Sequence, residues 1–212
     1  MPLIPAFATP IGHHEDVVPL ALCESLSTEI LKIVADPNET NTNHGDLGSC
    51  TQDNLHLRGG PFDELIKIIN PYVDGFIDEV LGIEPSDLEM TTMWSNTHHS
   101  GSMHPPHVHP NSFLSGVIYI KNPVGDDPGN LYFESPNPGS RAWFPNFKRD
   151  SMISDEELWF NPTVGKLLLF PSWLPHGVKQ FKAENDEPRI SIAFNYLITK
   201  CTRNTASFNL RG

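Results

Sequence analysis

The sequence predicts a mainly β fold of the α+β type, in which a few N-terminal helices pack against a sheet. Two observations lead to this prediction. Apolar residues recur at helical spacing only in the first part of the chain. From residue 87 onward, short β-like segments are separated by Pro, Gly, Asn and Asp. Such a series of short strands favours an all-β sandwich, a barrel or a jelly roll over a parallel βαβ sheet.

The N-terminal part, about residues 15–86, contains two segments with a helical pattern. Residues 17–35 carry apolar side chains at helical spacing, so that one face of the segment is apolar. A second helix is expected to begin at Pro61, because proline is well tolerated in the first helical turn. Pro71 is expected to break or kink this helix before Phe76 continues the pattern.

The remaining chain is predicted to form a β core over about residues 87–199, followed by a tail at 200–212. The predicted strands are 88–97, 112–121, 130–134, 166–170, 177–181 and 189–198. Residues 135–161 are rich in Pro and aromatic side chains and too long for a hairpin, which is typical of a lid or a binding loop. We expect residues 1–212 to form a single domain.

Composition and charge exclude several classes of protein. The 212 residues include 38% apolar residues, enough for a sizeable core, and the formal net charge is −12. Such a charge repels phosphate backbones, which argues against a nucleic-acid partner. No apolar run approaches the roughly 18 residues of a membrane span. The N-terminus lacks the pattern of a signal peptide, and the 3 cysteines form no CxxC motif. We therefore expect a cytoplasmic protein that does not contact membranes.

The segment MHPPHVHPN is the first candidate for a functional site. His107 and His109 are two residues apart, so on an extended chain both side chains leave the same face. Imidazoles placed in this way can bind one metal ion at about 2.0–2.1 Å. His104 is a weaker candidate, because Pro105 and Pro106 exclude the helix on which it would share a face with His107. The alternative is a solvated loop that binds nothing.

Two further segments carry candidate residues. An apolar strand runs into a Pro-rich turn that ends at His176, and on its own this residue fits an ordinary structural histidine better than a metal ligand. In the segment that follows, Arg189 and Ser191 share one face of a predicted strand. A buried arginine needs an anion, and its guanidinium suits a carboxylate. Alternatively, Arg189 lies on the solvent face and pairs with a surface acid.

Taken in order, these residues resemble the Fe(II)- and 2-oxoglutarate-dependent oxygenases, whose pattern is HxD/E, a distal His and a downstream RxS. The matching residues are His107 and His109, then His176, then Arg189 with Ser191. The flanking segments HxHPNSxLSGVIYI and GKLLLFPSWLPHGV…RISIAFN resemble the oxygenases of phages and marine bacteria more closely still. The resemblance covers about residues 90–198, roughly half of the chain.

The resemblance implies a double-stranded β-helix, a jelly roll whose major sheet is buttressed by the N-terminal helices. It also implies Fe(II), with 2-oxoglutarate and O2 as cosubstrates, and hydroxylation of a small-molecule or peptide substrate with succinate and CO2 as co-products. A phage-encoded enzyme would act in the host cytoplasm. The implied iron ligands are His107, His109 and His176. Arg189 would hold the distal carboxylate of 2-oxoglutarate with the help of Ser191. Tyr119, as a cofactor-binding residue, and either Trp94 or Asn96 are expected to line the pocket; the alternative for each is a core or strand-end residue.

One residue departs from the pattern of the family. Position 109 is His where Asp or Glu normally stands. A site of three histidines suits Fe(II), since imidazole is a good iron ligand and the same face stays open. Alternatively, Glu134 or Asp126 could supply a carboxylate, or His104 could replace one of the pair.

Two other functions fit parts of the sequence. A cupin-type metalloenzyme that uses no 2-oxoglutarate would account for His107, His109 and His176, but the glutamate of the cupin motif is missing and Arg189 has no role. A non-catalytic jelly-roll binding module would use the aromatic residues of segment 135–161 as a partner surface. The sequence does not identify the substrate or the oligomeric state.

Overall fold

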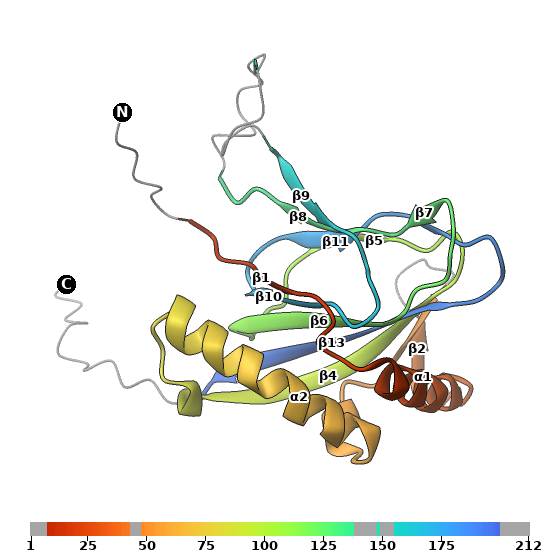
Figure 1. The fold of residues 1–212 in the computed structure, drawn as a ribbon, viewed down its shortest axis with the longest axis horizontal. Helices are drawn as coiled ribbons and strands as arrows, with labels where there is room; N and C mark the ends of the chain where they lie inside the picture. The colour runs from red at the N-terminus through yellow and green to blue at the C-terminus, as the bar shows by residue number, and fades with distance from the viewer. Residues whose placement is uncertain (1–7, 43–47, 138–147, 149–154, 200–212) are drawn as a thin grey trace, which may run out of the picture.

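A computed structural model describes residues 8–42, 48–137, 148 and 155–199, and two facing β-sheets dominate it (Figure 1). The major sheet has seven strands. In spatial order they are β1 (Gly12–His14), β10 (Leu167–Pro171), β6 (Leu114–Lys121), β13 (Arg189–Ile198), β4 (Leu88–His98), β3 (Gly48–Thr51) and β2 (Thr40–Thr42). The minor sheet has the order β5 (His104–His107), β11 (His176–Val178), β8 (Leu131–Glu134) and β9 (Glu157–Phe160). β7 (Asp127–Pro128) and β12 (Phe181–Lys182) form a small ribbon.

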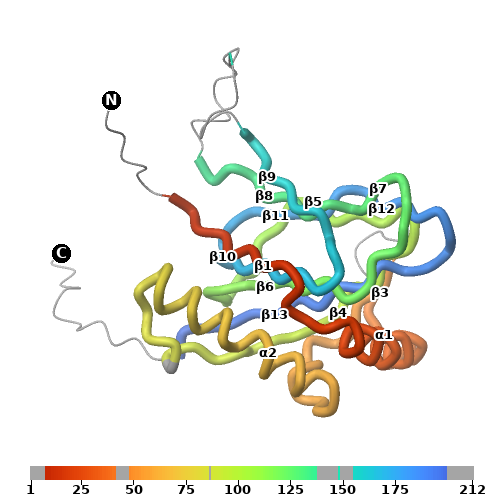
Figure 2. The backbone as a smooth tube through the Cα atoms, viewed as in Figure 1, coloured from red at the N-terminus to blue at the C-terminus, as the bar shows by residue number. Residues whose placement is uncertain are grey.

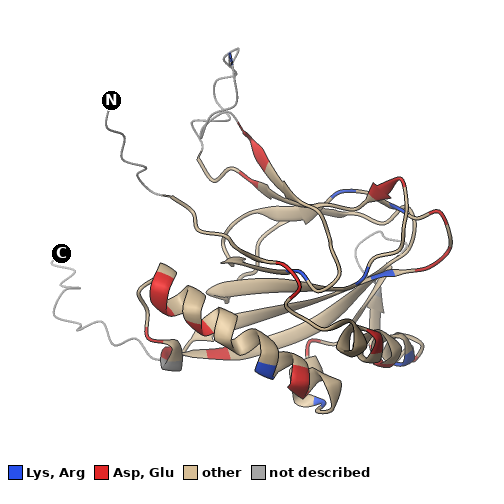
Figure 3. Ribbon diagram, viewed as in Figure 1, with Lys and Arg blue, Asp and Glu red and all other residues tan. Residues whose placement is uncertain are grey.

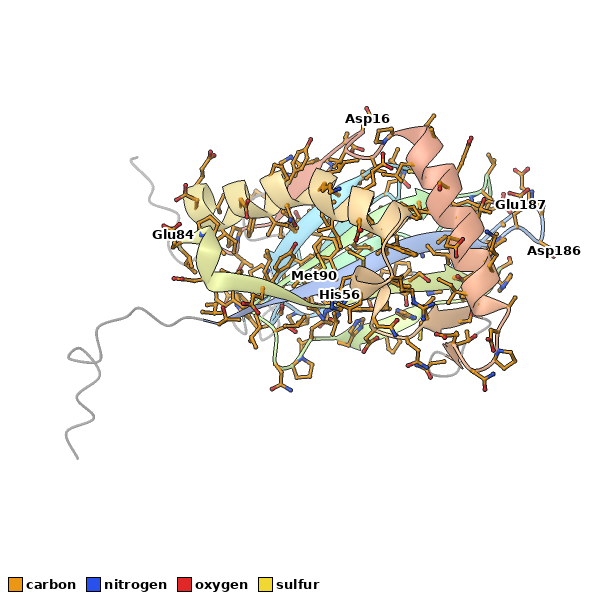
Figure 4. All side chains as sticks on the ribbon, turned by 90° about the horizontal axis from the view of Figure 1, so that it is seen from below. Asp16, His56, Glu84, Met90, Asp186 and Glu187 are labelled. Carbon is orange, nitrogen blue, oxygen red and sulfur yellow. The ribbon has the colours of Figure 1, made fainter. Side chains whose placement is uncertain are left out.

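Two helices cover the outer face of the major sheet, as the views in Figures 1 and 4 show. They are α1 (Leu20–Val34) and α2 (Pro61–Gly75), and the short turns are η1 (Leu55–Leu57), the π-helical η2 (Phe76–Val80) and η3 (Pro85–Asp87). Both helices bury one apolar face, which confirms the predicted packing of N-terminal helices on the sheet. Among the helices that the structure describes, none has the length and apolar character needed to cross a membrane.

Pro71 does not break the second helix, so of the two outcomes expected from the sequence, a break or a kink, the break is wrong and the kink stays a prediction. α2 continues through Pro71 to Gly75 and then passes into the π-helical turn η2. Proline removes one N–H from the helix and leaves the carbonyl four residues earlier, that of Lys67, without its helical partner. Because Lys67 is exposed, water can satisfy this carbonyl.

Alternation along β13 divides the interior into two layers. Ile190, Ile192 and Phe194 face the helices and belong to the larger core cluster between the helices and the major sheet. A second cluster, which includes Tyr119, Phe133 and other residues of β6, β8 and β10, fills part of the space between the two sheets. The predicted β core is therefore a two-layer sandwich. One face of the major sheet packs against the helices, and its other face is turned toward the minor sheet.

The first strand shows how the chain closes this architecture. β1 pairs with β10 although about 155 residues separate them, and Figure 2 shows the N-terminal segment lying along β10.

The acidic residues lie mostly on helices and loops, as Figure 3 shows. β6 and β13, by contrast, each contain a single charged residue, Lys121 and Arg189, at one end. The predicted lid segment 135–161 ends in β9, but residues 138–147 and 149–154 lie outside the described residues, so its predicted role is not tested.

Candidate active site

A cavity of about 370 Å³ lies between the two sheets and brings the predicted site residues together. Its walls come from β4, β5, β6, β8, β10, β11 and β13. In the described part of the chain, Arg189 is the one formally charged side chain among the lining residues, and no Asp or Glu is among them. Every residue predicted for the site lines this cavity: His107, His109, His176, Arg189, Ser191, Tyr119, Trp94 and Asn96.

Three histidines converge at one end of the cavity. His107 ends β5, and His176 begins β11 directly opposite it in the antiparallel register. His109 lies in the turn after β5, where its backbone N–H donates to the carbonyl of Ser172 at 2.9 Å. One ring nitrogen of each histidine lies within 4.8 Å of the corresponding atoms of the other two. This separation suits three ligands of one metal ion, since ligands at about 2.0–2.1 Å from a metal are a few ångströms apart.

Hydrogen bonds fix the same tautomer in all three rings. His107 Nδ1 lies 2.9 Å from the carbonyl oxygen of Pro105, and His176 Nδ1 lies 2.8 Å from that of Leu174. His109 Nδ1 lies 2.7 Å from the side-chain oxygen of Asn195. Because each partner is an acceptor, each Nδ1 carries the proton and donates it. The Nε2 lone pair of each ring is therefore available to a metal, in the arrangement typical of metal-binding histidines.

A buried polar network supports His109. Ser115 Oγ donates to the Asn195 side-chain oxygen at 2.7 Å and lies 2.8 Å from Ser172 Oγ. The Asn195 side-chain amide donates to Thr92 Oγ1 at 3.0 Å, which turns its oxygen toward His109. All of these groups are neutral. The network thus holds a neutral imidazole at position 109, where the resemblance would place a carboxylate.

Burial keeps the imidazoles in their metal-binding form. Desolvation, followed by the charge of His107, lowers the pKa of His176 to about 3. Desolvation also lowers the pKa of His109, against the opposing effect of its hydrogen bond with Asn195. A neutral imidazole is the form that coordinates metals, so these two rings need not lose a proton at neutral pH before they bind one.

Arg189 lies in the same cavity and is almost fully buried, with 1% of its surface exposed. Its Nη1 donates to Nδ1 of His98 at 2.9 Å, and its guanidinium lies 5.4 Å from the centre of the Tyr119 ring. Among the described residues, neither Arg189 Nε nor the Tyr119 hydroxyl has a hydrogen-bond partner. Desolvation, followed by the Arg189 charge, lowers the pKa of His98 to about 2, so His98 is neutral and adds no countercharge. A buried cation with unpaired donors beside it is suited to an anionic ligand such as a carboxylate.

The alternative in which Arg189 lies on the solvent face is therefore wrong. The three histidines suit a metal ion, and the buried arginine suits a dicarboxylate. Neither Glu134 nor Asp126, the acids considered as outside ligands, is among the described residues that line the cavity. Sequence reasoning missed His98 and Asn195 as parts of the site. Strand alternation puts Asn195 on the face of Arg189 and His98 on the face of Trp94 and Asn96, but alternation alone assigns no role to either residue.

Comparison with known proteins agrees with this arrangement. Residues 92–195 match the sequence profile of a family described as "Putative 2OG-Fe(II) oxygenase". A search of curated proteins by sequence finds no match.

Solved structures share the fold at low sequence identity. The non-heme alpha ketoglutarate dependent epimerase SnoN from nogalamycin biosynthesis is 15% identical, with a TM-score of 0.64, over 89% of this chain and 76% of that one. A prolyl-4-hydroxylase from Pseudomonas putida is 17% identical, with a TM-score of 0.59, over 88% and 92%. HygX from Streptomyces hygroscopicus, solved with nickel and 2-oxoglutarate, is 14% identical, with a TM-score of 0.61, over 90% and 84%.

The fold is therefore the double-stranded β-helix jelly roll that the sequence predicted, and the family match covers strands β4 to β13, from which the cavity is built. Within this fold, the matched segment contains His107, His109, His176 and Arg189. Residues 92–195, just under half of the chain, therefore match the family of putative 2OG-Fe(II) oxygenases, and the three histidines and the buried arginine of the cavity agree with that match.

Proposed function

We propose that the protein hydroxylates a small molecule or a peptide side chain, with succinate and CO2 as co-products, and that His107, His109 and His176 hold the iron. The observation that carries the proposal is the convergence of three histidines whose Nδ1 atoms all donate to oxygen, which leaves three Nε2 lone pairs at one end of the cavity. Fe(II) bound there would couple the oxidative decarboxylation of 2-oxoglutarate to the oxidation of a substrate C–H bond.

Arg189 is proposed to bind the distal carboxylate of 2-oxoglutarate, with Ser191 and Tyr119 beside it. β13 pairs with β6 so that Ser191 lies opposite Tyr119, and both side chains line the cavity next to the guanidinium. A dicarboxylate would supply the negative charge that the described lining residues lack. The burial of these groups keeps water from competing for the carboxylate.

The substrate class is supported by what similar structures contain. SnoN has been solved with nogalamycin RO, HygX with hygromycin B, and a prolyl hydroxylase from Trichoplax adhaerens with a peptide fragment of the hypoxia inducible factor. These are small molecules in two cases and a peptide in the third. The cupin alternative is disfavoured by Arg189, because an enzyme that binds no dicarboxylate has no use for a buried, uncompensated guanidinium.

The test is the visible charge-transfer band that forms when a 2-oxo acid chelates Fe(II). We expect wild-type protein to give the band when Fe(II) and 2-oxoglutarate are added anaerobically. His176→Ala should abolish it, because one of three ligands is lost. The Arg189→Ala variant should need a much higher concentration of 2-oxoglutarate to give the same band, because the distal carboxylate loses its partner. His99→Ala is the matched control, since His99 is exposed and is not among the lining residues.

Three outcomes would contradict parts of the proposal. Protein that binds Fe(II) stoichiometrically but gives no band would favour the cupin-type reaction. A band that survives His176→Ala would move the metal to other ligands. Protein that binds no Fe(II) at all would leave the non-catalytic binding module. If the band forms, coupling of succinate release to loss of a candidate substrate then tests hydroxylation.

A further inference from the structure

We propose that His98 is a positioning residue, which holds the Arg189 guanidinium in the orientation that binds the distal carboxylate of 2-oxoglutarate, and that His104 in turn fixes His98. The inference rests on the proposed binding of 2-oxoglutarate by Arg189. It assigns roles to two histidines that the metal site does not use.

The direction of the hydrogen bonds follows from the chemistry of the groups. A guanidinium has donors and no acceptor, so the contact of 2.9 Å between Arg189 Nη1 and His98 Nδ1 requires an unprotonated Nδ1. A neutral His98 then carries its proton on Nε2. This atom lies 3.3 Å from Nε2 of His104, which must accept the proton of the hydrogen bond. The chain of donors therefore runs from Arg189 through His98 to His104.

This direction also decides the role of His104. Its Nε2 lone pair is occupied by the hydrogen bond from His98, so that atom is not free to coordinate a metal. The His104 ring meets the His98 ring edge-on, with centroids 4.7 Å apart, and its own centroid is 6.0 Å from that of His107. The possibility left open by the sequence, in which His104 replaces a ligand, does not agree with this tautomer.

The surroundings make His98 a rigid support for the guanidinium. His98 and Arg189 are both about 1% exposed, and they lie directly opposite each other in the pairing of β4 with β13. The hydrogen bond to His98 occupies Nη1, whereas Nε has no partner among the described residues. The bond thus fixes the plane of the guanidinium and leaves a donor for a ligand. Without His98, a buried donor would lose its acceptor and the guanidinium could turn.

The experiment compares two 2-oxo acids by isothermal titration of the Mn(II)-loaded protein. 2-Oxoglutarate reaches both the metal and Arg189, whereas 2-oxobutanoate has no distal carboxylate and reaches only the metal. His98→Leu removes the acceptor, and His98→Asn keeps an acceptor near the position of Nδ1. We expect His98→Leu to weaken 2-oxoglutarate binding about tenfold to a hundredfold, since the lost bond involves a charged donor. Binding of 2-oxobutanoate and of Mn(II) should not change, and His98→Asn should restore part of the loss.

A second pair of variants tests His104 in the same assay. His104→Gln retains an acceptor near the position of Nε2, whereas His104→Leu does not, so only His104→Leu should weaken 2-oxoglutarate binding. His99→Leu is the matched control at the exposed neighbour of His98. If His104 were a metal ligand, both variants would instead weaken Mn(II) binding.

The outcomes separate this inference from the proposed function. If wild-type protein binds no 2-oxoglutarate, the proposed function fails. If Arg189→Ala weakens 2-oxoglutarate binding but His98→Leu does not, only the positioning role of His98 is overturned. Equal weakening of both 2-oxo acids by His98→Leu would also overturn it, because it would indicate a general structural role. Should His98→Leu fail to fold, the comparison of His98→Asn with the His104 pair decides the question.

Discussion

Asn195 connects the metal-binding end of the cavity to the strand behind it. Its side-chain oxygen accepts from His109, and its amide donates to Thr92. We expect Asn195→Leu to lower the affinity for Zn(II) or Co(II) about 10- to 100-fold, because His109 loses the partner that fixes its tautomer. Competition with a coloured chelator measures this affinity. Asn185→Leu, in an exposed loop, is the control. An unchanged affinity would mean that Ser115, whose Oγ lies 3.0 Å from His109 Nδ1, orients the ring without Asn195.

The site residues that could be predicted from the sequence are those that match a known motif. His107, His109, His176 and Arg189 were predicted as a set because their order resembles the motif of a known family, and the structure places all four in one cavity. His98 could not be predicted, because its role depends on the register between β13 and β4, which places it opposite Arg189. Register is a property of the folded sheet and leaves no local sequence pattern.

Gly177 determines how closely β11 fits between its two neighbouring strands. A Cβ atom at this position would lie 2.6 Å from the Tyr132 hydroxyl and 2.8 Å from the backbone oxygen of His104. We expect Gly177→Ala to reduce the free energy of unfolding by about 1–3 kcal/mol through overpacking. It should also weaken metal binding, because the displaced strand carries His176.

A second glycine provides the control for this change. A Cβ at Gly75 in α2 would meet nothing within 4 Å, and the backbone there is helical. Gly75→Ala should therefore stabilise the protein by about 0.5–1 kcal/mol and leave metal binding unchanged. Urea denaturation and metal titration of both variants make the comparison. Wild-type metal affinity in Gly177→Ala would show that β11 has room to adjust.

Strands with a regular apolar pattern could be predicted from the sequence, whereas a strand rich in proline could not. Five of the six predicted strands correspond to β4, β6, β8, β10 and β13 with small differences at their ends, whereas the sixth, 177–181, spans parts of both β11 and β12. β5 was missed because its sequence, HPPH, has two prolines, which sequence rules associate with loops. β5 lies at an edge of the minor sheet, where prolines are tolerated because an edge strand has fewer partners for its N–H groups.

The whole molecule should lose stability in mild acid when it contains no metal. The pKa of His98 is lowered to about 2 and that of His176 to about 3, whereas each is 6.5 in the unfolded chain. At pH values between the folded pKa and 6.5, the unfolded chain binds more protons than the folded protein does. The free energy of unfolding therefore falls as the pH falls below about 6.5. Each histidine contributes at most about 1.4 kcal/mol per pH unit.

Urea denaturation of the metal-free protein over this pH range measures the effect. His98→Asn should reduce the slope of stability against pH, because one of the two buried histidines is gone. His99→Asn should leave the slope unchanged, since His99 is exposed. A slope in His98→Asn equal to that of the wild type would mean that carboxylates, rather than buried imidazoles, control the acid sensitivity.

The cytoplasmic location and the relation to phage proteins remain predictions from sequence.

The position of β13 in the chain has a consequence for biosynthesis. This strand lies between β6 and β4 in the centre of the major sheet, although it is the last strand of the described residues. It brings Arg189 and Asn195 to the cavity on one face and completes the core with the other. A nascent chain that has left the ribosome only as far as His176 therefore has its three histidines but neither a closed sheet nor the support of His109. The complete cavity can therefore form only after β13 has joined the sheet, because Arg189 and Asn195 both come from this strand.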